Sequence, residues 1–449
     1  MVDASAAAYP ARAVAWYATL VMALLYWVSL FDRFIITLLV GPMKRDLGLT
    51  DVQFGVLNGF GFSLTFAVFG LLAGVLVDRH SRRWVVFAGV AVWSIATATC
   101  GLAQDYEQLL IARFCVGAGE AALVPAATSM ITDLFPRQRL GTALTVFGLG
   151  STIGSGTAFA FGGSIVQAVS HSATLTLPLV GAVRSWQAVF FFLGVPGALL
   201  AFGIFSFAEP RRRQLGQLAP TGGTWLASYR ALLQFMRARR RFFVCHYLGF
   251  LFVSAAFVGG VSWYATLMMR QFHWGPARAG LTLGLLLGVG GVAGQLLGGA
   301  GIDTMYRRGS RDAPLRWVAL TALAATPLGI AAVTSQHPAV LVAGLFGYLL
   351  CLQSMSTCIY AALNLVTPNE LRGTGAALFN ATSGLLGAGA GPVLVATLAQ
   401  QVYGSEASLG TAIATVMGVC YPLGALLLAL GMQPMRAAAL DQASRSFQS

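Results

Sequence analysis

The sequence predicts an all-α membrane protein whose twelve transmembrane helices form two pseudo-symmetric six-helix bundles. Of its 449 residues, 57% are hydrophobic and only 10% are charged, whereas a soluble protein carries about 25% charged residues. Twelve apolar runs are long enough to span a bilayer, which takes ~20 residues in a helix. Landmarks of the first half also recur in order in the second half.

The apolar runs place the expected helices. They are 16–40, 52–77, 84–104, 107–133, 139–168, 186–207, 242–270, 277–301, 316–334, 338–366, 373–402 and 408–432. The first run is too long for the apolar part of a cleavable signal and has no cleavage site, so we interpret it as a spanning helix.

One long polar segment divides the chain. It contains eight arginines and separates six apolar runs from six others. We therefore expect an N-terminal six-helix bundle at 1–207, a basic cytoplasmic linker at 208–241 and a C-terminal six-helix bundle at 242–449.

The basic residues predict the orientation of the chain. With both termini on one side, the connectors and tails of that side hold 21 lysines and arginines, and the opposite connectors hold five. The positive-inside rule then places both termini in the cytoplasm, with the chain in the cell inner or plasma membrane. A net charge of +13 often indicates nucleic-acid binding, but here the basic residues lie between apolar spans, so we expect no nucleic-acid partner.

The two halves repeat each other weakly. Gly74 and Asp78 recur as Gly299 and Asp303, 225 residues later, and Pro136 recurs as Pro368 after 232 residues. Matching landmarks in the same order indicate a duplicated six-helix unit.

Three ionisable residues are expected deep in the membrane, namely Asp32, Arg113 and Glu120. A charge at the bilayer centre costs about 3 kcal/mol on insertion scales, so such residues indicate a functional site. Asp32, beside Arg33, could bind and release a proton, or could form a static ion pair that holds the first helix against the fourth. Arg33 is interpreted mainly as an anchor.

Arg113 and Glu120 lie seven residues apart, on one helical face. Arg113 could hold an anionic headgroup or could neutralise Glu120 and Asp32. Glu120, like Asp32, is a candidate for proton coupling. The alternative for all three residues is a purely structural buried network.

The second half offers polar and aromatic side chains instead of charges. Together with Asp32, Arg113 and Glu120, the predicted substrate-binding residues include Trp263, Tyr264, Tyr360, Asn364 and Asn380.

Charged residues at the predicted cytoplasmic ends of the helices are candidates for a gate. Asp78 is expected near the start of the eleventh helix, where the helix dipole favours an anion, and Asp303 is its counterpart. Arg82 and Arg83 are expected to pair with Asp133 and so to close the cytoplasmic side.

Nothing in the sequence predicts an enzyme. The histidines and six cysteines lack metal-ligand spacing, and the glycine-rich runs are not phosphate loops, because no Gly-Lys-Ser follows them. We expect no cofactor and no metal, and we interpret the cysteines as packing residues. A receptor would leave the repeat of the two halves unexplained.

Several segments resemble a known family. GVLVDRHSRR at 74–83 is similar to the signature of the major facilitator superfamily. The segments that begin at Asp32 and Ala112, together with WQAVFFFLGVPGALL at 186–200, resemble its Spinster-like branch. The resemblance implies a monomeric, proton-coupled transporter of an amphiphilic lipid, such as a lysophospholipid or a sphingosine phosphate, that works by alternating access among membrane lipids. The alternative is a proton-coupled organic-anion or multidrug transporter of the same superfamily.

Overall fold

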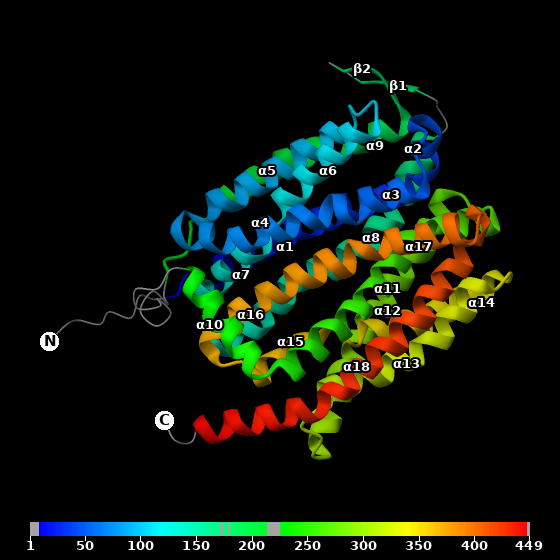
Figure 1. The fold of residues 1–449 in the computed structure, drawn as a ribbon. Coiled ribbons are helices and arrows are strands. Elements are labelled where there is room, and N and C mark those ends of the chain that lie inside the picture. Colours follow the sequence, from blue (N-terminus) through cyan, green and yellow to red (C-terminus); the bar gives the residue numbers. More distant parts are fainter. Residues whose placement is uncertain (1–8, 171–173, 178–179, 213–224, 447–449) are drawn as a thin grey trace.

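The computed structural model describes residues 9–170, 174–177, 180–212 and 225–446. Within these residues, twelve helices are long and apolar enough to cross a membrane. They lie within a few residues of the twelve expected runs, so the predicted helical fold is confirmed. Figure 1 shows that the chain ends on the side where it begins. We call that side the terminus side and the opposite side the far side.

The first half of the chain forms the first six spans. Its α-helices are α1 (Arg12–Ile35), α2 (Val40–Leu47), α3 (Asp51–Asn58), α4 (Phe60–Arg79), α5 (Arg82–Cys100), α6 (Tyr106–Glu120), α7 (Leu123–Leu134), α8 (Arg137–Val169) and α9 (Ser185–Leu200). Two 3-10 segments, η1 (Ile36–Leu38) and η2 (Ala201–Ser206), extend α1 and α9.

The second half forms the other six spans. Its α-helices are α10 (Trp225–Ala238), α11 (Arg240–Phe272), α12 (Pro276–Arg307), α13 (Ala313–Thr334), α14 (Pro338–Gln353), α15 (Ser356–Val366), α16 (Asn369–Thr382), α17 (Ala390–Thr397) and α18 (Leu409–Ser446). The eleventh span also contains two π-helical segments, η3 (Ser383–Ala388) and η4 (Leu398–Val402), and the 3-10 turn η5 (Glu406–Ser408) precedes α18.

Two elements were not expected from the sequence. The strands β1 (Thr174–Leu177) and β2 (Gly181–Arg184) form an antiparallel hairpin between α8 and α9, in the register Thr174 to Arg184. The helix α10 lies within the segment predicted as a polar linker. Its buried Leu232 explains why a segment rich in arginine still packs as a helix.

Some spans are interrupted, and two of the interruptions repeat. The fourth span breaks between Glu120 and Leu123, and the tenth breaks between Gln353 and Ser356. The breaks lie 233 residues apart, close to the spacing of the sequence repeat. In the fourth span, Pro125 lacks the N–H that an uninterrupted helix would use at this position. Broken helices of this kind are common at the binding sites of membrane transporters.

The two halves meet closely on α8 and α12, where both helices carry glycine. A side-chain carbon at Gly280 would collide with the carbonyl oxygen of Phe159, and one at Gly284 would collide with that of Gly156. A side-chain carbon at Gly148 or Gly299, nearer the terminus side, would meet no atom within 4 Å. Small residues therefore allow the backbones to touch toward the far side, whereas Gly148 and Gly299 face open space.

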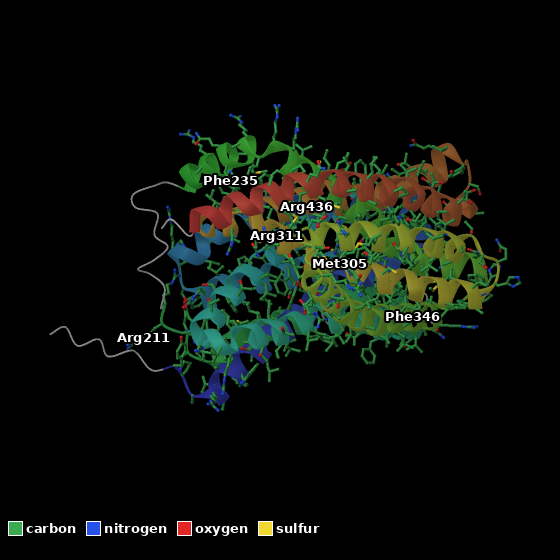
Figure 2. The ribbon with its side chains drawn as sticks, turned by 90° about the horizontal axis from the view of Figure 1, so that it is seen from below. Arg211, Phe235, Met305, Arg311, Phe346 and Arg436 are labelled. Atoms are coloured by element: carbon green, nitrogen blue, oxygen red, sulfur yellow. The ribbon has the colours of Figure 1, made fainter. Side chains whose placement is uncertain are left out.

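Arginines gather toward the terminus side of the molecule. In Figure 2, the labelled Arg211, Arg311 and Arg436 lie nearer that side than Phe346 does. Arg436 and Arg316 both pair with the buried Asp312, at 2.8 and 3.4 Å, and so join the start of α13 to the end of α18.

Candidate functional site

The candidate site lies where the fourth span breaks. Glu120 is the last residue of α6, and its side chain is only 2% exposed. Its Oε2 atom accepts hydrogen bonds from Ser29, at 3.1 Å, and from Arg33, at 2.5 Å. The other carboxylate oxygen, Oε1, has no hydrogen-bond partner. Glu120 is therefore held against α1 through one oxygen and keeps the other available.

Asp32 lies in the same region but faces a different helix. Asp32 is 1% exposed, and its Oδ2 atom accepts a hydrogen bond of 3.3 Å from Thr97 of α5. Its Oδ1 has no partner. Successive residues of a helix point about 100° apart, so Asp32 faces α5 while the adjacent Arg33 faces Glu120.

Arg33 and Arg113 share one aromatic ring. The guanidinium carbon of Arg33 lies 4.3 Å from the ring centroid of Phe62, and that of Arg113 lies 5.6 Å from it. Both distances fall within the range of cation–π attraction. The ring thus stabilises two cations whose charges would otherwise repel each other.

Arg113 does not form the ion pair that its spacing from Glu120 suggested. It is 1% exposed, and its Nε and Nη2 atoms have no hydrogen-bond partner. The residue interpreted mainly as an anchor, Arg33, is instead the ion-pair partner of Glu120. The reason is that Glu120 faces α1, whose Ser29 and Arg33 lie one helical turn apart.

The cluster therefore contains two carboxylates and two guanidinium groups with unused hydrogen-bonding capacity. The unpartnered atoms are Asp32 Oδ1, Arg33 Nε, Arg113 Nε and Nη2, and Glu120 Oε1. A buried polar atom without a partner costs about 1–3 kcal/mol. A proton, a water molecule or a polar ligand at this position would satisfy these atoms.

Two of the predicted substrate-binding residues are fully buried. Trp263 of α11 donates a hydrogen bond of 3.0 Å to the carbonyl oxygen of Pro392, and its ring lies edge-on to that of Phe54. Tyr264 packs edge-on to Tyr348. Both residues are 0% exposed, so in this conformation they pack helices together instead of facing solvent.

The other three predicted residues are accessible. Tyr360 is 40% exposed and donates a hydrogen bond of 2.6 Å to Asn380. Asn364 lies one turn after Tyr360 on α15 and is also exposed. These three polar residues belong to spans ten and eleven, so the second half presents a polar, uncharged face.

The predicted pair between Arg82 and Asp133 is present, and Arg82 also pairs with Glu209 at 3.2 Å. Ser81 donates a further hydrogen bond to Glu209. Arg83 does not pair with Asp133. It donates instead to the carbonyl oxygen of Phe207, and its guanidinium lies 5.4 Å from the ring of Phe205.

The contacts seen between described residues of this network join α5, α7 and the segment after η2, all in the first half of the chain. The expected pair of Arg83 and Asp133 is therefore wrong, because Arg83 contacts Phe205 and Phe207 instead. Closure of the cytoplasmic side by these residues stays a prediction. Asp303 is exposed, and it forms no ion pair with any residue in the described part of the chain. The side chain of Asp78 lies outside the described part.

An ion network that was not expected from the sequence joins the two halves on the far side. Asp51 accepts hydrogen bonds from Lys44, at 2.5 Å, and from Arg270, at 2.8 and 2.9 Å. Glu406 pairs with Lys44 and, at 3.1 Å, with Arg270. The signal was present in the sequence, since each half carries one acidic and one basic residue near a far-side helix end.

Uncharged contacts support the same closure. Asn58 donates a hydrogen bond of 2.8 Å to Ser262, and the backbone N–H of Val52 donates to Gln400 at 3.3 Å. Nearer the middle, Gln295 donates to Thr152 at 3.2 Å. Among these hydrogen bonds between described residues of the two halves, this last one lies nearest the terminus side. The far side is thus the closed side.

Twelve spanning helices in two halves, with an ionisable cluster in one half and an ion network joining both, define a multi-pass membrane transporter. The chain belongs to the Major Facilitator Superfamily, whose family model matches residues 22–392. In the described residues, no group of three His, Cys, Asp or Glu residues could hold a metal.

The chain is similar in sequence to individual transporters, among them an efflux pump and a Spinster protein. It is 28% identical over 434 residues to an MFS-type efflux pump of Mycolicibacterium smegmatis, covering 96% of this chain and 95% of that protein. It is also 28% identical over 268 residues to protein spinster homolog 1 of Mus musculus, covering 57% of this chain but only 46% of that relative.

A solved structure has the same fold. It is a bacterial homolog of the human lysosomal transporter Spinster in an inward-facing, unoccupied conformation, with a TM-score of 0.76 and 23% identity over 96% of this chain and 98% of that one. The predicted resemblance to Spinster proteins is confirmed.

Proposed function

We propose that this protein is a proton-coupled secondary active transporter of an amphiphilic lipid, of the lysophospholipid or sphingosine-phosphate type, working by alternating access. The observation that carries the proposal is the cluster of Asp32, Arg33, Arg113 and Glu120, in which every residue except the partly exposed Arg33 is buried. All four residues belong to one half, and both carboxylates keep one oxygen without a partner.

Proton binding would change the charge balance of this cluster. With both acids ionised, the two carboxylates balance the two guanidinium groups. A proton on Glu120 removes the attraction of its carboxylate for Arg33, which now holds it at 2.5 Å. The cluster then carries a net positive charge that an anionic headgroup can neutralise. Loss of the proton restores the pair with Arg33 and favours release of the headgroup.

The substrate class is proposed from the contrast between the halves. Arg113 supplies hydrogen-bond donors without a partner, whereas the accessible polar residues of the second half, Tyr360, Asn364 and Asn380, are uncharged. An amphiphile with one anionic or zwitterionic head and an apolar chain matches this distribution. Each buried methylene contributes about 0.8 kcal/mol, so the chain would supply most of the affinity.

We propose that both termini are cytoplasmic and that the protein lies in the cell inner or plasma membrane, because basic residues gather on the terminus side. The far side is then the outer side. The network of Lys44, Asp51, Arg270 and Glu406 closes the outer side in this conformation, and substrate would enter or leave from the cytoplasmic side.

Binding of a lysolipid series to the purified protein tests the substrate class. Affinity should rise roughly fourfold with each added methylene, the equivalent of about 0.8 kcal/mol, until the chain exceeds the available length. Arg113→Gln should weaken binding of every member of the series. Arg12→Gln, which changes an exposed arginine at the start of α1, serves as the control and should not.

A second candidate is a proton-coupled carrier of organic anions or drugs. The similarity to an MFS-type efflux pump over almost the whole chain favours it. Tight binding of a short organic anion, with an affinity for lysolipids that does not change with chain length, would select this candidate over the lipid transporter.

A further inference from the structure

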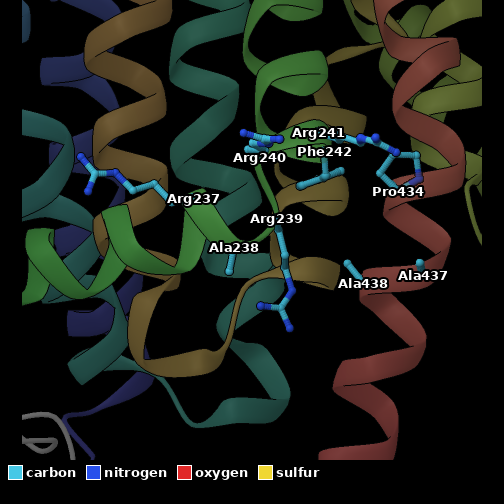
Figure 3. Close-up of a pocket in the computed structure, with 9 residues that line it drawn as sticks. All are labelled: Arg237, Ala238, Arg239, Arg240, Arg241, Phe242, Pro434, Ala437 and Ala438. Carbon is cyan, nitrogen blue, oxygen red and sulfur yellow. The ribbon is translucent and has the colours of Figure 1, made fainter.

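Four arginines within a run of five residues line a pocket at the terminus side, away from the central cluster. Arg237, Arg239, Arg240 and Arg241 come from the end of α10 and the start of α11, and Pro434 and Ala437 of α18 form the opposite wall. The pocket has a volume of about 630 Å³. Figure 3 shows it between the α10–α11 junction and α18.

Three of the four arginines in this pocket are not paired with an acidic residue in the part of the chain that the structure describes. Arg237, Arg240 and Arg241 are exposed and form no ion pair with any residue that the structure describes, and the pocket lining contains no acidic residue. Elsewhere on the same side, Arg82 pairs with Asp133, and Arg436 pairs with Asp312. A pocket lined by arginines and by no acidic residue favours an anionic ligand.

The pocket lies at the level of a membrane surface. Arg240 is the first residue of the seventh span, and Pro434 and Ala437 lie just after the twelfth apolar run, 408–432. The helix α10 presents Leu232 to the core and leaves Leu233 exposed beside its arginines. A helix with apolar and basic faces at this level is typical of one that lies in the headgroup region.

An exposed apolar stripe continues from the pocket along α11. Arg241, Val244 and Leu248 occupy successive turns of one helical face, and Val244 and Leu248 are 52% and 41% exposed. A free phosphate ion has no apolar group that could pack against this stripe. A lipid would place its phosphate among the arginines and an acyl chain along Val244 and Leu248.

We propose that this pocket binds the phosphate of an anionic phospholipid from the surrounding membrane. Arginine is suited to this task because its planar guanidinium can donate two parallel hydrogen bonds to phosphate. The inference goes beyond the proposed function, because it concerns a membrane lipid held at the periphery and does not depend on the transported substrate.

Lipid binding to the purified full-length protein tests the proposal. Native mass spectrometry in an uncharged detergent would measure the affinity for phosphatidylglycerol, for zwitterionic phosphatidylcholine and for inorganic phosphate. The double variant Arg240→Gln/Arg241→Gln should bind phosphatidylglycerol roughly 25-fold more weakly, or roughly fivefold for each arginine removed. The single variants provide the same test if the pair does not fold.

A matched control removes the same charge from the same side. Arg308→Gln/Arg311→Gln changes two exposed arginines outside the pocket and should leave the affinity for phosphatidylglycerol nearly unchanged. Val244→Ser/Leu248→Ser should weaken binding of phosphatidylglycerol while the arginines remain.

Equal losses in the pocket and control variants would overturn the proposal, because they would indicate a diffuse positive field. Inorganic phosphate that binds as tightly as phosphatidylglycerol would also overturn it, because the apolar stripe would then contribute nothing.

Discussion

The carboxylate of Asp51 accepts two hydrogen bonds from the guanidinium of Arg270, at 2.8 and 2.9 Å, although the two residues lie 219 positions apart in the chain. Asp51 is at the start of α3 and Arg270 is near the end of α11, so the pair joins the two halves of the transporter. The carboxylate is fully buried, and the arginine side chain is 25% exposed. Lys44 and Glu406 extend the pair to a four-residue network.

Breaking this pair should favour opening of the far side. Asp51→Asn removes the charge that both Arg270 and Lys44 contact, and loss of one partner of a buried charged pair costs roughly 2 kcal/mol or more. The ratio of open to closed molecules should therefore rise by about thirtyfold or more, at 1.4 kcal/mol per tenfold change. Spin labels at positions 104 and 336, exposed far-side residues in opposite halves, should report longer distances.

Arg278→Gln is the matched control for this experiment. Arg278 is also a far-side arginine of the second half, but it lies over the ring of Trp274, 4.2 Å from its centroid, within its own half. Its substitution should leave the label distances as in the unsubstituted protein. If Asp51→Asn also left them unchanged, the network would not contribute to closure.

Neutralising either buried acid should abolish proton coupling. In Glu120→Gln the side chain can still accept hydrogen bonds from Ser29 and Arg33, but it no longer titrates. Transport driven by a pH gradient in proteoliposomes should fall by roughly 100-fold, which corresponds to about 3 kcal/mol lost with a buried charged pair. Asp32→Asn should have a similar effect.

Glu107→Gln provides the control, because Glu107 is an exposed acid in the first turn of the same helix, α6. It should transport at the unsubstituted rate. Full pH-driven transport by both Glu120→Gln and Asp32→Asn would contradict the assigned proton sites.

The close contact of α8 and α12 predicts a steric effect on transport. A methyl group at Gly284 would collide with the carbonyl oxygen of Gly156, so Gly284→Ala should hinder far-side closure. We expect transport to fall while the protein still folds, since the halves can separate slightly. Gly299→Ala on the same helix meets no atom within 4 Å and should transport normally. Equal transport by the two variants would argue against closure at this contact.

Glu209 predicts a dependence of stability on pH. Burial raises its pKa, but hydrogen bonds from Ser81 and Arg82 outweigh that effect and lower the pKa below its ordinary value of 4.5. A lowered folded-state pKa stabilises the protein above pH 4.5, and this contribution is lost as the pH falls through the folded-state value. The temperature of thermal unfolding should therefore decrease as the pH is lowered below 4.5. The decrease should be less steep in Glu209→Gln. An identical pH profile for that variant would show that the network of Arg82 does not contribute.

Properties that depend on local sequence were predictable. Each span requires only a run of ~20 apolar residues, so all twelve could be placed within a few residues. The repeat of the halves is also visible in the sequence, and the breaks in the fourth and tenth spans follow its spacing. The cost of burying a charge identified Asp32, Arg113 and Glu120 as candidates, and all three are buried.

The partners of these residues depended on the tertiary structure, because helical spacing determines which residues share a face but not which face meets a neighbouring helix. Glu120 therefore pairs with Arg33 of another span instead of Arg113 on its own helix. Trp263 and Tyr264 are buried because α11 turns them toward other helices. The pair of Asp51 and Arg270 required the two halves to close on the far side. That approach is set by small residues at the helix crossings, such as Gly280 and Gly284, and no local pattern reveals which pair of helices will meet there.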